Sequence, residues 1–152
     1  MSQQQGKLSL KTRALRHLAA REHSRAELER KLAGHVSADD PGELTRALDE
    51  LTAKGFINEQ RVAESVLHRR AGKLGAARIL QELRAKALSD NTLRAAADAL
   101  RASELERARA VWHKKFGAPP QDATGRARQL RFLAARGFSA EIARRVVGGD
   151  DC

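Results

Sequence analysis

Histidine, cysteine and paired carboxylates are the side chains most able to bind metals or catalyse reactions, but their spacing in this chain predicts neither. The histidines do not pair at i, i+4, and no cysteine or acidic cluster completes a zinc ligand set. We expect all five to be surface or boundary residues: His17, His23, His35, His68 and His113. The single cysteine, Cys152, stands at the C-terminal end, where it can neither cross-link a core nor complete a zinc site. This usage fits a reducing compartment and leaves the role of Cys152 open.

Phosphate-binding and nucleophilic motifs are missing as well. The segment Gly72-Lys73-Leu74-Gly75 lacks the Gly-x4-Gly-Lys-Ser/Thr spacing that cradles nucleotide phosphates. No nucleophile elbow occurs, and no pair of carboxylates stands apart from ordinary charges on a helix surface. We therefore expect a protein that binds and does not catalyse, with no cofactor.

The cations, in contrast, are strongly patterned. Lys and Arg outnumber Asp and Glu by 29 to 19, and the formal charge is +10. The first basic segment, residues 68–86, has one carboxylate, Glu82, and six cations: Arg69, Arg70, Lys73, Arg78, Arg84 and Lys86. The second basic segment, residues 126–145, has one carboxylate, Glu141, and six cations: Arg126, Arg128, Arg131, Arg136, Arg144 and Arg145. Six minus one gives +5 for each segment, so together they account for the whole surplus.

Two clusters of this kind predict a polyanionic or acidic partner. Cations on helices that face a phosphate backbone release counterions on binding, and the same surface suits an acidic protein groove. Our candidate contact residues are the six cations of the first basic segment with Arg126, Arg128, Arg131 and Arg136 of the second. The alternative is that both clusters are only solvated faces of amphipathic helices. The chain has no signal peptide and no apolar run of the roughly 18 residues that a membrane span needs, so we expect a cytoplasmic protein with no membrane partner.

The aromatic residues are expected mainly in the core. Trp112 and Phe116 are one turn apart on an apolar face, and Phe56 and Phe138 each follow a glycine that is expected to end a helix. Phe132 is the exception, because an arginine flanks it on a less regular apolar stripe. It is therefore the aromatic residue that we consider for contact with a partner.

The elements that must position these side chains are helices. Apolar residues recur at helical spacing almost throughout, as in Leu44, Ala47, Leu48 and Leu51, while no stretch alternates with period two. The pattern predicts an all-α chain. Its nine short helices are expected at about residues 9–21, 24–34, 40–54, 58–71, 75–86, 89–102, 104–116, 123–136 and 139–147.

Capping residues support these bounds. Ser24–Glu27 and Ser103–Glu106 have the spacing of a capping box, in which a serine and a glutamate satisfy first-turn backbone donors reciprocally. Asp40–Glu43 is typical of a helix start with proline at the first helical position. Gly55 and Gly137 each follow a basic residue and are expected to end a helix.

The nine expected helices fall into threes. A leucine, an apolar residue shortly after it and a serine that opens a helix recur at intervals of about 50 residues. The three copies are Leu32 with Val36-Ser37, Leu83 with Leu88-Ser89, and Leu133 with Phe138-Ser139. They predict three tandem three-helix repeats, over residues 9–57, 58–102 and 103–148, in an elongated monomer.

Four stretches, taken in order and at this spacing, resemble a known family over nearly the whole chain. They are Ala14–Leu28, Leu48–Leu51 with Gly55–Glu64, Gly75–Leu83, and Arg126–Ser139. The family is that of the RecX regulatory proteins. The chain departs from the family pattern at Val62, where an aromatic residue is frequent, at Ala76, where proline is common, and at Ala87, where glycine is usual.

The resemblance implies three tandem three-helix repeats, a curved shape, and docking in the helical groove of RecA assembled on single-stranded DNA. It also implies inhibition: restrained filament growth, with less ATP hydrolysis, strand exchange and repressor cleavage by RecA. Duplex DNA is a second candidate nucleic-acid partner. The sequence does not assign individual cations to protein or to phosphate.

Two other functions stay open. A helix-turn-helix regulator could place a basic helix in the major groove of a specific duplex, usually as a dimer, although the chain shows no heptad seam for dimerisation. A passive helical scaffold or nonspecific nucleic-acid chaperone would need the charge without any groove geometry.

Overall fold

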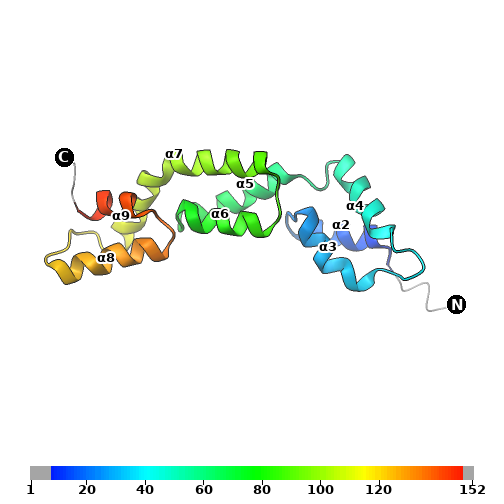
Figure 1. Cartoon of the computed structure of the whole chain (residues 1–152), viewed down its shortest axis with the longest axis horizontal. Coiled ribbons are helices and arrows are strands. Elements are labelled where there is room, and N and C mark those ends of the chain that lie inside the picture. Colours follow the sequence, from blue (N-terminus) through cyan, green and yellow to red (C-terminus); the bar gives the residue numbers. More distant parts are fainter. Residues whose placement is uncertain (1–7, 149–152) are drawn as a thin grey trace. The chain divides into compact units, whose positions relative to one another are not determined.

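The computed structural model describes residues 8–148, and every regular element in that range is helical (Figure 1). The α-helices are α2 (Leu10–Ala20), α3 (Arg25–Leu32), α4 (Glu43–Ala53), α5 (Glu59–Arg70), α6 (Ala76–Ala85), α7 (Asp90–Lys115), α8 (Ala123–Ala135) and α9 (Ala140–Val147). A 3₁₀ turn, η1 (Ala33–His35), follows α3 directly. The all-α prediction is confirmed. Cys152 lies outside the described residues.

The chain divides into two compact units. Within the described part, the first unit consists of residues 8–62 and 86–88, and the second of residues 63–85 and 89–148. Helix α5 begins in the first unit and continues in the second. The repeat boundaries expected from the sequence and the elongated, curved shape stay predictions.

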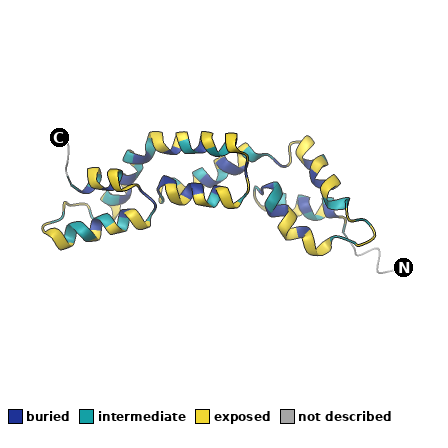
Figure 2. Ribbon diagram, viewed as in Figure 1, coloured by how far each residue is buried: buried dark blue, intermediate teal, exposed yellow. Residues whose placement is uncertain are grey.

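The core of the first unit is built from α2, α3 and α4. Helix α2 contacts both α3 and α4, and Figure 2 shows buried residues on the facing sides of these helices. Leu28, Leu48 and Leu51 are completely buried there. Each buried leucine contributes roughly 2 kcal/mol to the folded state. The apolar stripe that the sequence predicts on α4 is therefore the face that holds the unit together.

Serines cap the helices at most of the predicted positions. Ser24 Oγ accepts a hydrogen bond from the Glu27 backbone N–H, and Glu27 Oε1 accepts one from the Ser24 N–H, which confirms the capping box of α3. Ser89 and Ser139 cap α7 and α9 in the same extended conformation. Two of the three serines of the repeat pattern thus open a helix as expected.

The start of α4 differs from the prediction. The helix begins at Glu43 after Gly42, and not after Asp40. The Asp40 carbonyl accepts from the Glu43 N–H, while the Asp40 carboxylate forms an ion pair with Arg46, so the expected cap is part of a turn. Ser37 lies in the same connection and opens no helix.

His23 is buried, which contradicts the prediction that all five histidines lie at the surface or boundary. His23 is only 2% exposed, although it lies in the short connection between α2 and α3. Nδ1–H donates to the Arg21 carbonyl at 3.0 Å, and the ring centroid lies 5.5 Å from that of His17. Nε2 has no hydrogen-bond partner in the described chain. Burial lowers the pKa of His23, because it disfavours the charged imidazolium.

The second unit is organised around α7. Helices α6 and α9 both pack on α7, and α8 packs on α9. Ala108 and Leu133 are completely buried between these helices, with Phe138 beside them. Ile79 and Leu83 of α6 are completely buried as well.

The sixth and seventh helices expected from the sequence form one continuous helix, α7, so the predicted break at Ser103 is wrong. Ser103 Oγ donates back to the carbonyls of Ala99 and Leu100 and accepts from Arg107 Nε. A serine inside a helix can make such bonds without ending it. Because α7 contains neither glycine nor proline, nothing else in its sequence ends it there, and no capping box forms with Glu106.

The predicted helix stops at Gly55 and Gly137 are confirmed. Both glycines have positive φ, 82° and 93°, and the N–H of each following phenylalanine donates to a carbonyl in the last turn of the helix. Phe138 is 4% exposed and seals its turn as expected. Phe56 is 48% exposed, so the expectation of a core position is wrong for it, and the next residue, Ile57, is buried instead.

Candidate polyanion-binding site

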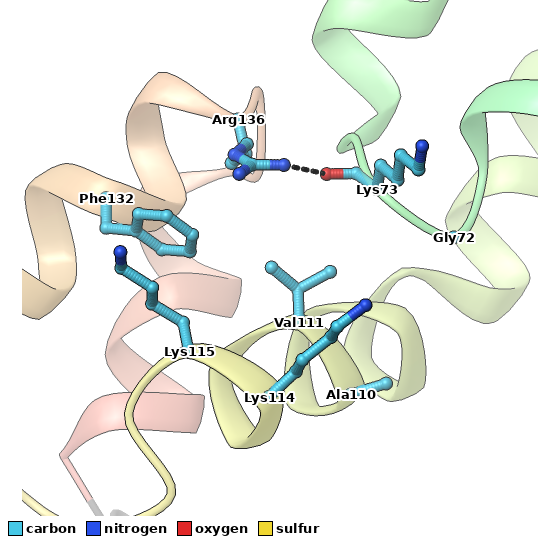
Figure 3. Close-up of a pocket in the computed structure, with 8 residues that line it drawn as sticks. All are labelled: Gly72, Lys73, Ala110, Val111, Lys114, Lys115, Phe132 and Arg136. Carbon is cyan, nitrogen blue, oxygen red and sulfur yellow. Dashed lines mark hydrogen bonds between the residues drawn. The ribbon is translucent and has the colours of Figure 1, made fainter.

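A hollow in the second unit brings together cations from three elements (Figure 3). Its volume is about 650 Å³, and we refer to it as the basic hollow. It is lined by Gly72, Lys73, Ala110, Val111, Lys114, Lys115, Phe132 and Arg136. Lys73 comes from the α5–α6 connection, the other two lysines from the end of α7, and Arg136 from the end of α8. No lining residue is acidic, so the field in the hollow favours an anion.

Arg136 is the fixed member of this set. Its Nη1 donates to the Lys73 carbonyl at 3.3 Å, and its guanidinium lies 4.9 Å from the centroid of the Phe132 ring. Lys115 Nζ lies 5.6 Å from the same centroid. The three lysines are exposed at the rim. Their flexible stems let the ammonium groups follow an anion, while the guanidinium keeps its place.

Backbone hydrogen bonds fix the α5–α6 connection against the end of α8. The first N–H groups of a helix have no partner within that helix. Here the Gly75 N–H donates to the Arg136 carbonyl at 2.7 Å, and the Ala77 N–H donates to the Gly137 carbonyl at 3.2 Å. The start of α6 thus caps the end of α8, which holds Lys73 near Arg136.

Gly75 is required at this junction because the two backbones touch. A Cβ atom on Gly75 would lie 2.3 Å from the carbonyl carbon of Gly137 and equally close to the Phe138 nitrogen. Arg78 covers the junction, since its Nη1 donates to the Ala135 carbonyl at 2.7 Å. Gly75 and Arg78 belong to the third motif of the family resemblance, and the residues that they meet belong to the fourth.

Arg107, which the sequence analysis did not single out, holds the same connection from α7. Its guanidinium donates to the carbonyls of Ala71 at 3.0 Å, Leu74 at 2.7 Å and Leu100 at 3.0 Å. Burial lowers the pKa of Arg107, although the Glu104 carboxylate acts in the opposite direction. Arginine stays charged in proteins, so the buried guanidinium needs hydrogen-bond acceptors in place of water, and the three carbonyls provide them. Among the alternating charges of α7, no local pattern marks this residue.

The other cations of the first basic segment are dispersed. Arg69 is exposed at the end of α5, and Arg70 forms an ion pair with Glu82 at 3.4 Å. Arg84 lies in a separate hollow between α6 and α7 that also contains Asp90. The structure therefore does not bring the whole segment to one place.

Lys86 belongs to the first unit and is engaged there. Its Nζ lies 3.0 Å from Glu27 Oε1, and its side chain is only 13% exposed. Burial raises the pKa of Glu27, but the Ser24 N–H, Lys86 and Arg21 outweigh this, and the pKa falls to about 2. Lys86 therefore neutralises a buried carboxylate of the folded unit.

The second basic segment lies on α8 and α9. Arg128 and Arg131 are exposed on α8, and Arg131 flanks a shallow apolar groove with Arg144. The Arg126 guanidinium lies against Gly148 at the end of α9. Of the ten candidate contact residues, only Lys73 and Arg136 line the basic hollow.

Lys114 and Lys115 are the site residues that the sequence analysis missed. They fall between the two basic segments, where a count of charge along the chain gives them no weight. The one available signal was their position in the last turn of a helix, just before Phe116 and Gly117, because side chains at a helix end can lie next to neighbouring elements. Phe132, singled out for possible contact, is half-buried in the wall of the hollow.

Two further properties concern the described residues alone. In the range 8–148 no helix combines the length and apolar character needed to cross a bilayer. In the same range no three histidine, cysteine or acidic side chains gather as a set that could hold a metal ion.

Fold and site together define an all-helical repeat protein that presents a cationic hollow. Family models agree with this class and narrow it: "RecX, second three-helix domain" matches residues 58–96, and "RecX, third three-helix domain" matches residues 102–147. The chain belongs to the RecX family of regulatory proteins, which confirms the resemblance that its motifs carry.

Close relatives span almost the same length. The regulatory protein RecX of Leptothrix cholodnii is 54% identical over 147 residues, which cover 97% of this chain and 92% of the relative. The regulatory protein RecX of Ralstonia nicotianae is 49% identical over 144 residues, covering 95% and 89%.

Solved structures support the helical repeat fold. A crystal structure of a regulatory protein RecX has a TM-score of 0.73 and 16% identity, covering 93% of this chain and 72% of that one. The RecX of Lactobacillus salivarius has a TM-score of 0.72 and 21% identity, covering 93% and 94%. At such identities the likeness shows the fold alone.

Proposed function

We propose that this protein regulates RecA by binding the filament that RecA forms on single-stranded DNA, and that it restrains filament growth. Lower ATP hydrolysis, strand exchange and repressor cleavage by RecA follow from that restraint. The protein acts in the cytoplasm, in DNA repair and the SOS response. It works by binding, without a catalytic step of its own.

The basic hollow is the observation that carries this proposal. A filament on DNA offers regularly spaced phosphates and acidic protein surfaces, both of which favour a concentration of positive charge. Four cations from three elements converge on one hollow without a carboxylate among them. Backbone hydrogen bonds hold the α5–α6 connection against the end of α8, so two of these cations keep a fixed spacing. A fixed spacing of cations suits a partner with regularly repeated charges better than charge spread evenly over solvated helices.

Co-sedimentation tests the proposal directly. The protein is spun with preassembled RecA filaments and, separately, with naked single-stranded DNA of the same length. We expect it to pellet with filaments at lower concentration than with naked DNA. The double variant Lys114→Ala/Lys115→Ala should bind filaments several-fold more weakly, and its salt dependence should fall by about two counterions.

A charge-matched control separates the hollow from net charge. Arg16→Ala/Lys31→Ala also removes two exposed cations, but from the first unit, and should bind filaments within about twofold of the wild type. If both double variants lose the same filament affinity, the effect comes from net charge and not from the basic hollow. Tight binding to one duplex sequence, with no filament binding, would favour a helix-turn-helix regulator instead.

A further inference from the structure

We infer that the basic hollow holds one nucleotide unit of a single DNA strand, with its phosphates on the rim lysines and its base against the ring of Phe132. This deepens the proposed function and rests on it, because it assigns the hollow to the nucleic acid of the filament and not to its protein. The juxtaposition of an aromatic wall with cations that have no carboxylate beside them in the lining of the hollow carries the assignment.

The size and lining of the hollow fit such a unit. Its volume of about 650 Å³ lies within the range of small-ligand pockets, roughly 300–1,000 Å³. Cations stand at the rim, while Ala110, Val111 and Phe132 provide apolar surface. Phosphate needs the cations, and the flat face of a base needs the apolar surface.

Neighbouring side chains hold the ring of Phe132 in an orientation on which a base can stack. The Phe116 ring meets the Phe132 ring edge-on, with centroids 5.3 Å apart and an interplanar angle of 86°. Arg136 fixes it further at 4.9 Å. Lys115, on its exposed and flexible stem, is the group that must move from the ring to a phosphate when a base arrives. Stacking of a base on an aromatic side chain tolerates any sequence, because every base has a π-face.

An aromatic wall also separates nucleic acid from an acidic peptide. Carboxylates need only the cations and gain nothing from the ring of Phe132. Bases in a duplex are already stacked on their neighbours, so they cannot use the ring without leaving the stack. The site therefore favours single-stranded nucleic acid over both alternatives.

The test compares two strands of equal charge in the absence of RecA. Fluorescently labelled oligothymidylate and an abasic oligomer of the same length are titrated with the full chain at fixed salt. We expect the base-containing strand to bind about fivefold or more tightly than the abasic strand. In Phe132→Leu this preference should disappear, while affinity for the abasic strand stays unchanged.

Phe56→Leu is the matched control, because Phe56 is exposed but does not line the hollow. It should keep the full preference for bases. Circular dichroism melts confirm that both variants fold. Should Phe132→Leu unfold, Lys114→Gln provides the second arm, and we expect it to weaken both strands alike and lower the salt dependence by about one counterion.

Two competitors define the ligand. Neither a hundredfold excess of free thymidine monophosphate nor polyglutamate of matched charge should displace the oligothymidylate from the wild type. Displacement by the free nucleotide would overturn the assignment to a strand, and displacement by polyglutamate would assign the hollow to acidic protein. Loss of base preference in Phe56→Leu and not in Phe132→Leu would overturn the role of the ring. Since no RecA is present, failure here is distinguishable from failure of filament binding.

Discussion

At the residue scale, Ala87 shows backbone strain. It is the non-glycine residue with positive φ in the described chain, at 55°. An L-residue in this left-handed conformation costs about 1–2 kcal/mol, and glycine avoids that cost but loses more chain entropy on folding. Ala87→Gly should therefore raise the free energy of unfolding by about 0.5–1 kcal/mol in urea titrations.

The control for Ala87→Gly is the same exchange inside a helix. Ala95 is exposed on α7, where glycine costs about 1 kcal/mol relative to alanine. Ala95→Gly should lower stability, so the two variants should move in opposite directions. A loss of stability in both would show that the turn at Ala87 is not strained.

His23 makes stability depend on pH. Its folded-state pKa is lowered, so its contribution is fully present above the ordinary value of 6.5 and is lost as pH falls from there through the folded value. Glu27, whose pKa is about 2, stays charged over that window. His23→Asn keeps a donor for the Arg21 carbonyl but cannot titrate. Between pH 7.5 and 5.5, urea midpoints should therefore fall more for the wild type than for this variant, whereas exposed His113→Asn should behave like the wild type.

Individual residues also show what sequence reasoning could and could not find. Ser24 and Gly137 were predictable because local chemistry dictates a cap or a helix stop, wherever the element lies. Lys114 and Arg107 were not, because their importance comes from side chains and carbonyls more than 15 residues away. The prediction that His23 lies at the surface or boundary was wrong for the same reason, because the burial of a residue in a connection depends on which helices pack over it.

At the element scale, the junction between α6 and α8 can be tested by one methyl group. Gly75→Ala would force apart two touching backbones and strain two hydrogen bonds, at a cost of about 2–4 kcal/mol. Gly72, three residues earlier, has open space around its Cβ position. Gly72→Ala should therefore change stability by less than about 1 kcal/mol. Thermal melts of both variants check this, and equal behaviour would contradict the role of the junction.

Most helices were predictable from the sequence, but the boundary expected at Ser103 was not, because α7 continues through it. The hydrophobic period of 3.6 marks each helix, but a break between two helices needs a residue that ends the first. The spacing of Ser103 to Glu106 fits a capping box and therefore predicts a new helix start at this point. The same serine can bond within a helix, and only the surrounding packing decides which occurs.

At the scale of the whole molecule, tandem repeats predict an extended monomer. A compact globule of this length would have a radius of gyration of about 15 Å. Small-angle scattering should give a clearly larger value, with a monomeric mass, because repeats contact mainly their neighbours along the chain. A radius near that of a globule, or a dimeric mass, would contradict the prediction.

An extended repeat protein should also inhibit RecA at low stoichiometry. Several weak contacts on one scaffold act as a multivalent ligand, whose avidity for an assembled filament greatly exceeds its affinity for a free subunit. Titrated into filaments preformed on single-stranded DNA at fixed salt, the protein should slow ATP turnover at concentrations well below that of RecA. Alone, it should show no ATPase or nuclease activity.

Charge in the basic hollow provides the internal control for that titration. If the cations supply contacts along the filament, Lys114→Ala/Lys115→Ala should shift the inhibition curve to higher concentration and make it less sensitive to salt. The fold should persist, because exposed charges contribute little to stability. If ATP turnover by RecA is unchanged at equimolar wild-type protein, and the protein binds one duplex sequence tightly, the protein is a transcriptional regulator and not a regulator of the filament.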